Sequence, residues 1–174
     1  TIIVQGHGIR GNAFFFCLDR SGSMAWNWHG QVKIQWAKEW LLEAIQALDD
    51  DMEFGLLAFD AGMLIFSEEP VRATGRMKDA AIAWVMGIPT GQSTCLAPAG
   101  VKTLSIANLS ARARPRVVVI TDGLPDCNGS LTQAQCLRDI TAANVRKIPI
   151  DTLFIPDDET WEDPDFLREL ARQN

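Results

Sequence analysis

Two runs of consecutive apolar residues constrain the fold of this chain more than any other feature of its sequence. Phe14–Leu18 and Val117–Ile120 show no alternation of apolar and polar side chains, which is typical of central strands that helices cover on both faces. Other strand-like segments alternate along the chain with segments whose apolar residues recur at helical spacing. Strands separated by helices pair in parallel through right-handed crossovers. The sequence therefore predicts an α/β fold, a doubly wound three-layer sandwich around a mostly parallel sheet.

The expected elements follow one another without an internal repeat. Strands are expected at residues 14–18, 52–59, 63–66, 116–121 and 148–155, and helices at residues 32–48, 74–85, 99–109, 130–146 and from Asp163-Pro164 onward. Because the turn Asp60-Ala61-Gly62 joins the second and third strands as a hairpin, we expect one antiparallel edge strand in the sheet. The chain has 174 residues, a length that fits one domain. We expect residues 1–12 to form an N-terminal strand and linker, and residues 13–174 to form the domain.

A glycine-rich run, Gly6-His7-Gly8-Ile9-Arg10-Gly11, matches the spacing of a dinucleotide-binding motif. That motif requires a helix to open at its third glycine. In this chain Gly11 leads instead into the strand expected at residues 14–18. We therefore interpret the run as a turn between an N-terminal strand and the core.

The charge and hydropathy of the chain argue against two classes of partner. The sequence has 16 basic and 22 acidic residues, a net charge of −6, and no cluster of lysines and arginines, so a nucleic-acid partner is not expected. No apolar run reaches the roughly 18 residues that a membrane span needs. The sequence begins at Thr1 rather than at a methionine. We therefore expect it to be part of a longer protein, whose other domains are further partners.

Polar side chains gather where the two apolar runs end. Asp19, Ser21 and Ser23 follow the first run, and Asp122 follows the second. In open α/β sheets, sites form outside the carboxyl ends of the strands. Carboxylate and hydroxyl oxygens suit hard cations such as Mg²⁺ or Mn²⁺, and two carboxylates balance a divalent charge. The sequence therefore predicts a cation site at this edge of the sheet.

The run Asp19-x-Ser21-x-Ser23 resembles the metal-ion-dependent adhesion site of the von Willebrand factor type A domain. Thr94, in a loop that precedes a helix, is similar to the third-element threonine of that family, and Asp122-Gly123 is similar to its fifth element. The order of strands and helices resembles the family over roughly residues 13–174. The family fold is Rossmann-like. The family sheet has a further strand after its last helix, and we expect that strand to be absent from this sequence, which ends after the last expected helix.

The resemblance implies a role for each of these residues. Ser21 and Ser23 would bind Mg²⁺, or Mn²⁺ or Ca²⁺ in its place, directly through their hydroxyls. Thr94 would bind directly in the ligand-bound state, and Asp19 and Asp122 would act largely through water. The remaining position on the cation would accept a carboxylate from a protein ligand that presents an acidic residue. The resemblance therefore implies metal-dependent protein binding, as in adhesion.

Enzyme alternatives fit the same residues less well. An aspartyl phosphatase motif needs a second aspartate where Ser21 stands, and an aspartic protease motif is interrupted by Arg20. A serine nucleophile would have only His7 and His29 as bases. Metal-dependent hydrolysis needs a base within reach of a metal-bound water, and none is evident beyond Asp19 and Asp122 themselves. We therefore expect no enzyme. The alternative to adhesion is a regulatory or substrate-recruiting subunit of an ATPase-coupled chaperone or chelatase.

Two tryptophans and a histidine follow the predicted metal loop. Trp26, Trp28 and His29 lie between Ser23 and the first helix. Tryptophans in such a loop either pack against the body of the domain or contact a partner. We take Trp26 and Trp28, with His29, as candidate partner contacts, and partial burial as the alternative.

The four cysteines fall into two kinds. Cys17 and Cys95 are interpreted as small core residues. Cys127 and Cys136 flank a turn that leads into a helix, and they either form a disulfide or remain two free thiols. A disulfide would imply an oxidising compartment, and with it a location outside the cytoplasm, in the cell envelope.

Overall fold

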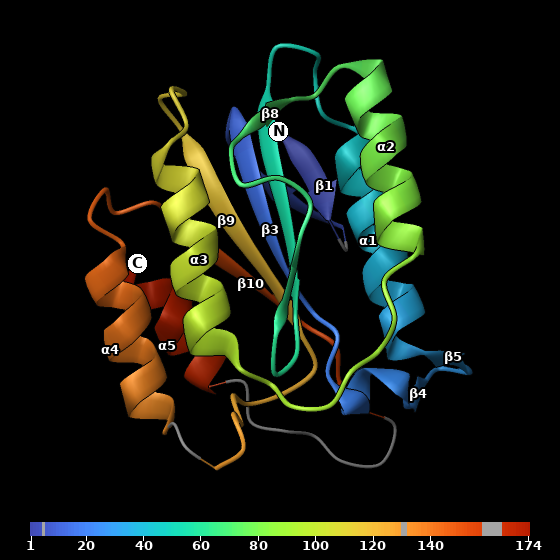
Figure 1. Cartoon of the computed structure of the whole chain (residues 1–174), viewed down its shortest axis with the longest axis vertical. Coiled ribbons are helices and arrows are strands. Elements are labelled where there is room, and N and C mark those ends of the chain that lie inside the picture. The colour runs from blue at the N-terminus through green and yellow to red at the C-terminus, as the bar shows by residue number, and fades with distance from the viewer. Residues whose placement is uncertain (5, 130–131, 158–164) are drawn as a thin grey trace.

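A mostly parallel sheet runs through the centre of the molecule (Figure 1). The computed structural model describes residues 1–4, 6–129, 132–157 and 165–174. The strand order is β10-β9-β3-β6-β7, and β8 also pairs with β6. The strands of this sheet are β3 (Ala13–Asp19), β6 (Glu53–Phe59), β7 (Met63–Ile65), β8 (Val71–Arg72), β9 (Pro115–Thr121) and β10 (Ile150–Phe154).

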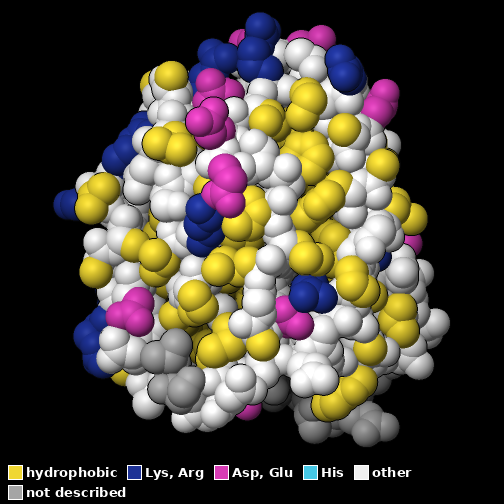
Figure 2. Space-filling view, viewed as in Figure 1, with side chains coloured by type: hydrophobic (Ala, Val, Ile, Leu, Met, Phe, Trp, Pro, Cys, Tyr) yellow, Lys and Arg dark blue, Asp and Glu magenta, His cyan; other side chains and the backbone are white. Residues whose placement is uncertain are grey.

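The pairing confirms the predicted α/β architecture. Strands β10, β9, β3 and β6 pair in parallel, and β7 returns antiparallel to β6 through the expected hairpin. The short antiparallel strand β8 was not anticipated. Strand β7 lies at the end of the strand order, and its Met63 and Leu64 side chains are exposed. Figure 2 shows apolar side chains on the surface between α2 and α3, over this part of the sheet.

Helices cover both faces of the sheet and make three layers. Helices α1 (Lys33–Gln46) and α2 (Gly75–Met86) pack on one face, and α3 (Leu96–Asn108), α4 (Gln133–Ala143) and α5 (Asp165–Gln173) pack on the other (Figure 1). No helix within the described ranges combines the length and the apolarity that crossing a membrane requires.

The two faces of β3 explain why its sequence lacks alternation. Phe14, Phe16 and Leu18 point into the core beneath α1 and α2, whereas Phe15 and Cys17 point into the core beneath α3 and α4. All seven residues of β3 are buried. Because successive side chains of a strand point to opposite faces, only a strand covered on both sides is apolar at every position.

The N-terminal residues form a separate antiparallel hairpin of β1 (Ile2–Val4) and β2 (His7–Ile9). Ile2 and Val4 are buried in the same core cluster as the inner face of α1. The hairpin turn includes Gly6, whose φ of 74° favours glycine. A Cβ on Gly11 would lie 2.9 Å from Cγ of Arg116. The glycine-rich run therefore serves a turn and a close approach, and β3 rather than a helix follows it.

Some helix boundaries differ from those expected. Helix α3 begins at Leu96, three residues early, because Pro98 falls in the first turn, where a missing N–H is tolerated. Helix α4 is capped by Thr132, whose side chain accepts from the Gln135 N–H. The expected capping residue Ser130 and the expected start of the last helix at Asp163-Pro164 lie outside the described residues.

Candidate metal centre

The topology brings Asp19 and Asp122 to the same edge of the sheet. Asp19 is the last residue of β3, and Asp122 directly follows β9. The two strands are parallel neighbours in which Leu18 is level with Ile120. Both carboxylates therefore lie at the carboxyl ends of adjacent strands, where α/β sheets form their sites.

A chain of hydrogen bonds joins four of the five predicted ligands. Oδ1 of Asp19 accepts from the backbone N–H of Ser21 at 2.7 Å. The hydroxyl oxygens of Ser21 and Ser23 are 3.2 Å apart, and Ser23 Oγ donates to Oδ1 of Asp122 at 2.9 Å. Oδ2 of Asp19 accepts from the Thr121 hydroxyl at 2.6 Å. The 3-10 helix η1 (Gly22–Ala25) holds Ser23 in this network.

The electrostatics of this cluster favour an added cation. Asp19 is fully buried and Asp122 is 5% exposed. Burial, and then the nearby Asp122 carboxylate, raise the pKa of Asp19 to about 7, although hydrogen bonds from Thr121 and Ser21 oppose the rise. A divalent ion would offset both the lost hydration and the repulsion.

The donor set also fits a hard cation. The groups that converge are carboxylate and hydroxyl oxygens, the ligands that Mg²⁺ and Mn²⁺ prefer. Within the described part of the chain, no three histidine, cysteine, aspartate or glutamate side chains converge as a metal site. A cation at this edge would therefore depend on the hydroxyls of Ser21 and Ser23 as well as on the carboxylates.

Thr94 is held against the same edge by its backbone. Its N–H donates to the carbonyl of Asp126 at 2.9 Å, and the Asp126 N–H donates back to the Thr94 carbonyl at 3.1 Å. Two residues earlier, the carbonyl of Gln92 accepts from the Gly22 N–H at 2.9 Å. The Thr94 loop thus contacts both the loop after β3 and the loop after β9.

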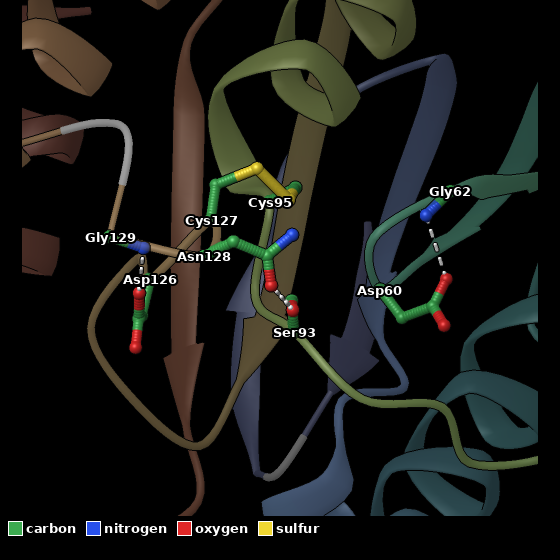
Figure 3. Close-up of a disulfide and its surroundings, with 8 residues drawn as sticks. All are labelled: Asp60, Gly62, Ser93, Cys95, Asp126, Cys127, Asn128 and Gly129. Carbon is green, nitrogen blue, oxygen red and sulfur yellow. Dashed lines mark hydrogen bonds between the residues drawn. A yellow bond between two sulfur atoms is a disulfide. The ribbon is translucent and has the colours of Figure 1, made fainter.

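A disulfide joins Cys95 to Cys127 (Figure 3), so both alternatives for Cys127 and Cys136, a bridge between them or two free thiols, are wrong. Thr94 and Asp126 form an isolated antiparallel bridge. The residues that follow each of them, Cys95 and Cys127, have Cα atoms 4.4 Å apart. Cys136 is a free thiol buried in the core under α4. The Cys95–Cys127 pairing was missed because local sequence patterns do not indicate a contact between residues 32 positions apart.

Further hydrogen bonds fix the loops around the disulfide (Figure 3). Ser93 Oγ donates to Oδ1 of Asn128 at 2.6 Å, and the Gly129 N–H donates to Oδ1 of Asp126 at 2.9 Å. Asp60, at the end of β6, accepts from Arg20 Nη2 at 2.7 Å through its side chain and from the Cys95 N–H at 3.1 Å through its carbonyl. The loops that carry the predicted ligands are therefore bound to one another.

Sequence reasoning missed one charged residue in the site. Nζ of Lys33 lies 2.7 Å from Oδ2 of Asp122 and 3.4 Å from Oδ2 of Asp157, and the Lys33 side chain is 1% exposed. Lys33 is the first residue of α1. A cation at a helix N-terminus opposes the helix dipole. That unfavourable placement, between the apolar residues Val32 and Ile34, was the signal available in the sequence.

The three candidate contact residues lie in different environments. Trp26 is 61% exposed, and its ring centroid lies 5.6 Å from the Lys33 ammonium. Trp28 is half-buried and packs edge-on against Trp36 and Trp40. His29 is exposed in the turn between β4 (Asn27–Trp28) and β5 (Gln31–Val32), against the Trp28 ring. Only Trp26 combines exposure with proximity to a residue that binds Asp122.

Comparison with known proteins places the fold. A family model described as the von Willebrand factor type A domain matches residues 14–124. Curated proteins gave no significant match. A solved von Willebrand factor type A structure from Catenulispora acidiphila superposes with a TM-score of 0.80 at 23% identity, over 94% of this chain and 37% of the other.

Two further solved structures share the fold. The conserved protein BatB from Bacteroides thetaiotaomicron gives a TM-score of 0.69 at 17% identity, over 94% of this chain and 86% of its own. The pilus adhesin SpaC from Lactobacillus rhamnosus GG gives 0.70 at 15% identity, over 96% of this chain and 28% of its own. This chain therefore spans well under half the length of the first and third of these proteins.

Proposed function

Because this chain belongs to the von Willebrand factor type A domain family, we propose that it is a metal-dependent protein-binding module. A divalent cation at the carboxyl ends of β3 and β9 would bridge to a carboxylate of a protein partner. The hydrogen-bonded network of Asp19, Ser21, Ser23 and Asp122 supports this proposal most directly. It gathers oxygen ligands of the right chemistry at one edge of the sheet.

The residues divide into two roles. The hydroxyls of Ser21 and Ser23, with that of Thr94, would contact Mg²⁺, or Mn²⁺ or Ca²⁺ in its place. Asp19 and Asp122 would balance the charge of the ion without contacting it directly. Bound there, the ion supplies an electrophilic position for an incoming carboxylate. Few charged ligands on the ion leave more of its charge for the partner.

Binding fits the site better than catalysis does. Each carboxylate already accepts two hydrogen bonds: Asp19 from Ser21 and Thr121, and Asp122 from Ser23 and Lys33. The pKa of Asp19, about 7, would suit a general base that acts at neutral pH. The Asp19 side chain, however, is fully buried. A general base must reach the proton that it removes. We therefore propose that these carboxylates hold a cation rather than act on a substrate.

Three further observations support an adhesive role outside the cytoplasm. Among the solved structures of the same fold, one is a pilus adhesin. The Cys95–Cys127 disulfide suits an oxidising compartment such as the cell envelope. Trp26 supplies an exposed aromatic ring beside the site, and tryptophan is enriched among the residues that dominate interface energies.

An array of immobilised peptides tests the proposal. Peptides with a central Glu or Asp are compared with matched peptides that carry Gln or Asn, and each is probed with the domain in Mg²⁺ and in EDTA. We expect retention on the acidic peptides in Mg²⁺ only. Retention that survives EDTA, or that ignores the change from Glu to Gln, would overturn the proposal. Wild-type protein and a Ser21→Ala variant are run together, because the variant should need at least tenfold more Mg²⁺ for the same retention.

A further inference from the structure

The ammonium of Lys33 already occupies part of the cation site. Oδ1 of Asp122 accepts from Ser23, and Oδ2 accepts from Lys33, so both oxygens of this carboxylate are engaged. The Lys33 and Asp122 side chains are each 1% exposed. A divalent ion that binds near Asp122 would therefore share the carboxylate with a buried positive charge.

Asp157 adds a second negative charge on the other side of Lys33. Its Oδ2 lies 3.4 Å from Nζ, and its side chain is 16% exposed. Its Oδ1 is buried and has no hydrogen-bond partner among the residues that the structure describes. The Lys33 ammonium is thus the one cation described between these two carboxylates.

We propose that Lys33 is a built-in counter-cation that keeps the metal-free site stable and weakens its affinity for divalent ions. This inference rests on the proposed metal centre. Without a metal, the single ammonium offsets part of the negative charge of Asp122 and Asp157, and a buried carboxylate left without any partner is strongly destabilising. With a metal, the two cations repel each other across a buried carboxylate, where screening by solvent is weak. Lys33 therefore sets how tightly the site holds its ion.

The position of Lys33 favours this role over a purely structural one. A lysine at the first residue of a helix gains nothing from the helix dipole, which disfavours a cation there. Lys38 provides a contrast on the same helix: it is 5% exposed, and its Nζ donates to the carbonyls of Met86 and Ile88 at 3.1 and 2.7 Å. Lys38 caps a helix end, whereas Lys33 binds two carboxylates.

Isothermal titration with MgCl₂ tests the inference on wild type, Lys33→Met and the matched control Lys38→Met. Removing the charge of Lys33 should tighten Mg²⁺ binding about tenfold or more, since one buried repulsion is worth at least about 1.4 kcal/mol. Lys38→Met should leave the Mg²⁺ affinity unchanged. An unchanged or weaker affinity in Lys33→Met would overturn the inference, because a residue that only positions Asp122 would give that result.

Thermal unfolding in EDTA and in saturating Mg²⁺ provides an independent readout. Lys33→Met should unfold at a lower temperature than wild type in EDTA and recover most of the difference in Mg²⁺. Lys38→Met should lose the same number of degrees in both buffers. An equal loss in both buffers for Lys33→Met would contradict a counter-cation role.

A second variant keeps the test decisive if Lys33→Met does not fold without metal. The double variant Lys33→Met/Asp157→Asn removes one charge of each sign, and it should still bind Mg²⁺ more tightly than wild type because Asp122 has lost its ammonium.

Failure of the inference and failure of the proposed function give different results. No Mg²⁺ binding by wild type or by either variant contradicts the metal centre itself. Binding by wild type that Ser21→Ala weakens, with no gain on removing Lys33, contradicts only the role of Lys33.

Discussion

Thr94 and Asp126 exchange two backbone hydrogen bonds, of 2.9 and 3.1 Å, across 32 positions of sequence. This pair sets the loop that carries a predicted metal ligand against the loop that follows Asp122. The Cys95–Cys127 disulfide joins the residues that follow Thr94 and Asp126, so it links the same two loops covalently. The position of Thr94 therefore depends on a covalent bond as well as on hydrogen bonds.

Loss of the disulfide should weaken both the fold and the metal site. For a loop of 32 residues, the double variant Cys95→Ser/Cys127→Ser should lower the free energy of unfolding by about 3 to 4 kcal/mol. It should also weaken Mg²⁺ binding, because Thr94 is no longer held covalently. Denaturant unfolding and isothermal titration measure the two effects. A disulfide-linked peptide of Cys127 and Cys136 in a non-reducing digest would disprove the pairing.

The two free cysteines serve as an internal control for that experiment. Burial raises the pKa of both Cys17 and Cys136 to about 12, so at neutral pH each stays a protonated, unreactive thiol. Reaction with a thiol reagent should therefore be slow in the native protein and should reach two thiols only after unfolding. Rapid reaction of the native, unreduced protein would show that one of these side chains is accessible.

The metal-free protein should lose stability as the pH rises. The pKa of Asp19 is raised from 3.8 to about 7, so between these values the folded protein holds a proton that the unfolded chain releases. This stabilisation is complete below pH 4 and is lost as the pH rises through 7. Its upper limit is about 4 kcal/mol. Denaturant unfolding in EDTA at several pH values measures it, and Asp19→Asn should flatten that part of the profile.

Substitution of the metal ligands should separate binding from folding. Ser21→Ala should weaken Mg²⁺ binding at least tenfold while costing only about 1 kcal/mol of stability, since it removes one hydrogen bond and no charge. Asp122→Ala should abolish Mg²⁺ binding, but it also strips Lys33 of its nearest partner, and a buried pair broken in this way costs about 3 to 5 kcal/mol. Isothermal titration and thermal unfolding measure the two effects. Undiminished Mg²⁺ affinity in Ser21→Ala would remove this hydroxyl from the site.

The two loop tryptophans should behave differently when replaced by alanine. Trp26→Ala should change stability by less than about 0.5 kcal/mol, because the ring is mostly exposed. It should nevertheless reduce retention on acidic peptides in Mg²⁺. Trp28→Ala should cost about 2 to 4 kcal/mol, because its ring packs against Trp36 and Trp40. Unchanged peptide retention in Trp26→Ala would exclude this ring from the binding surface.

Much of the fold could be predicted because short sequence patterns indicate its strands, helices and turns. The unbroken apolar runs of β3 and β9 reveal burial on both faces, and Asp60-Ala61-Gly62 reveals the β6–β7 hairpin. The polar residues after β3 and β9 could be brought together because parallel strands end at a common edge. In each case, the signal and the structure lie within a few residues of each other.

What escaped prediction depends on contacts between distant segments. Cys95 was interpreted as a small core residue, because nothing near it in the sequence indicates its disulfide with Cys127, 32 positions away. The role of Lys33 was missed because its partners Asp122 and Asp157 lie 89 and 124 residues further along the chain. Strand β8 is two residues long, too short for any periodicity to appear.

The disulfide also has a mechanical consequence. Helix α3 and strand β9 lie between Cys95 and Cys127, so a pull on the two ends of the chain cannot extend them while the bond is intact. At 3.3 to 3.6 Å per residue, the 32-residue separation hides about 110 Å of contour length from an applied force. Under tension, the force would pass through the disulfide from the Thr94 loop to the loop that follows Asp122. Strand β9, which leads to Asp122, would therefore not bear that force.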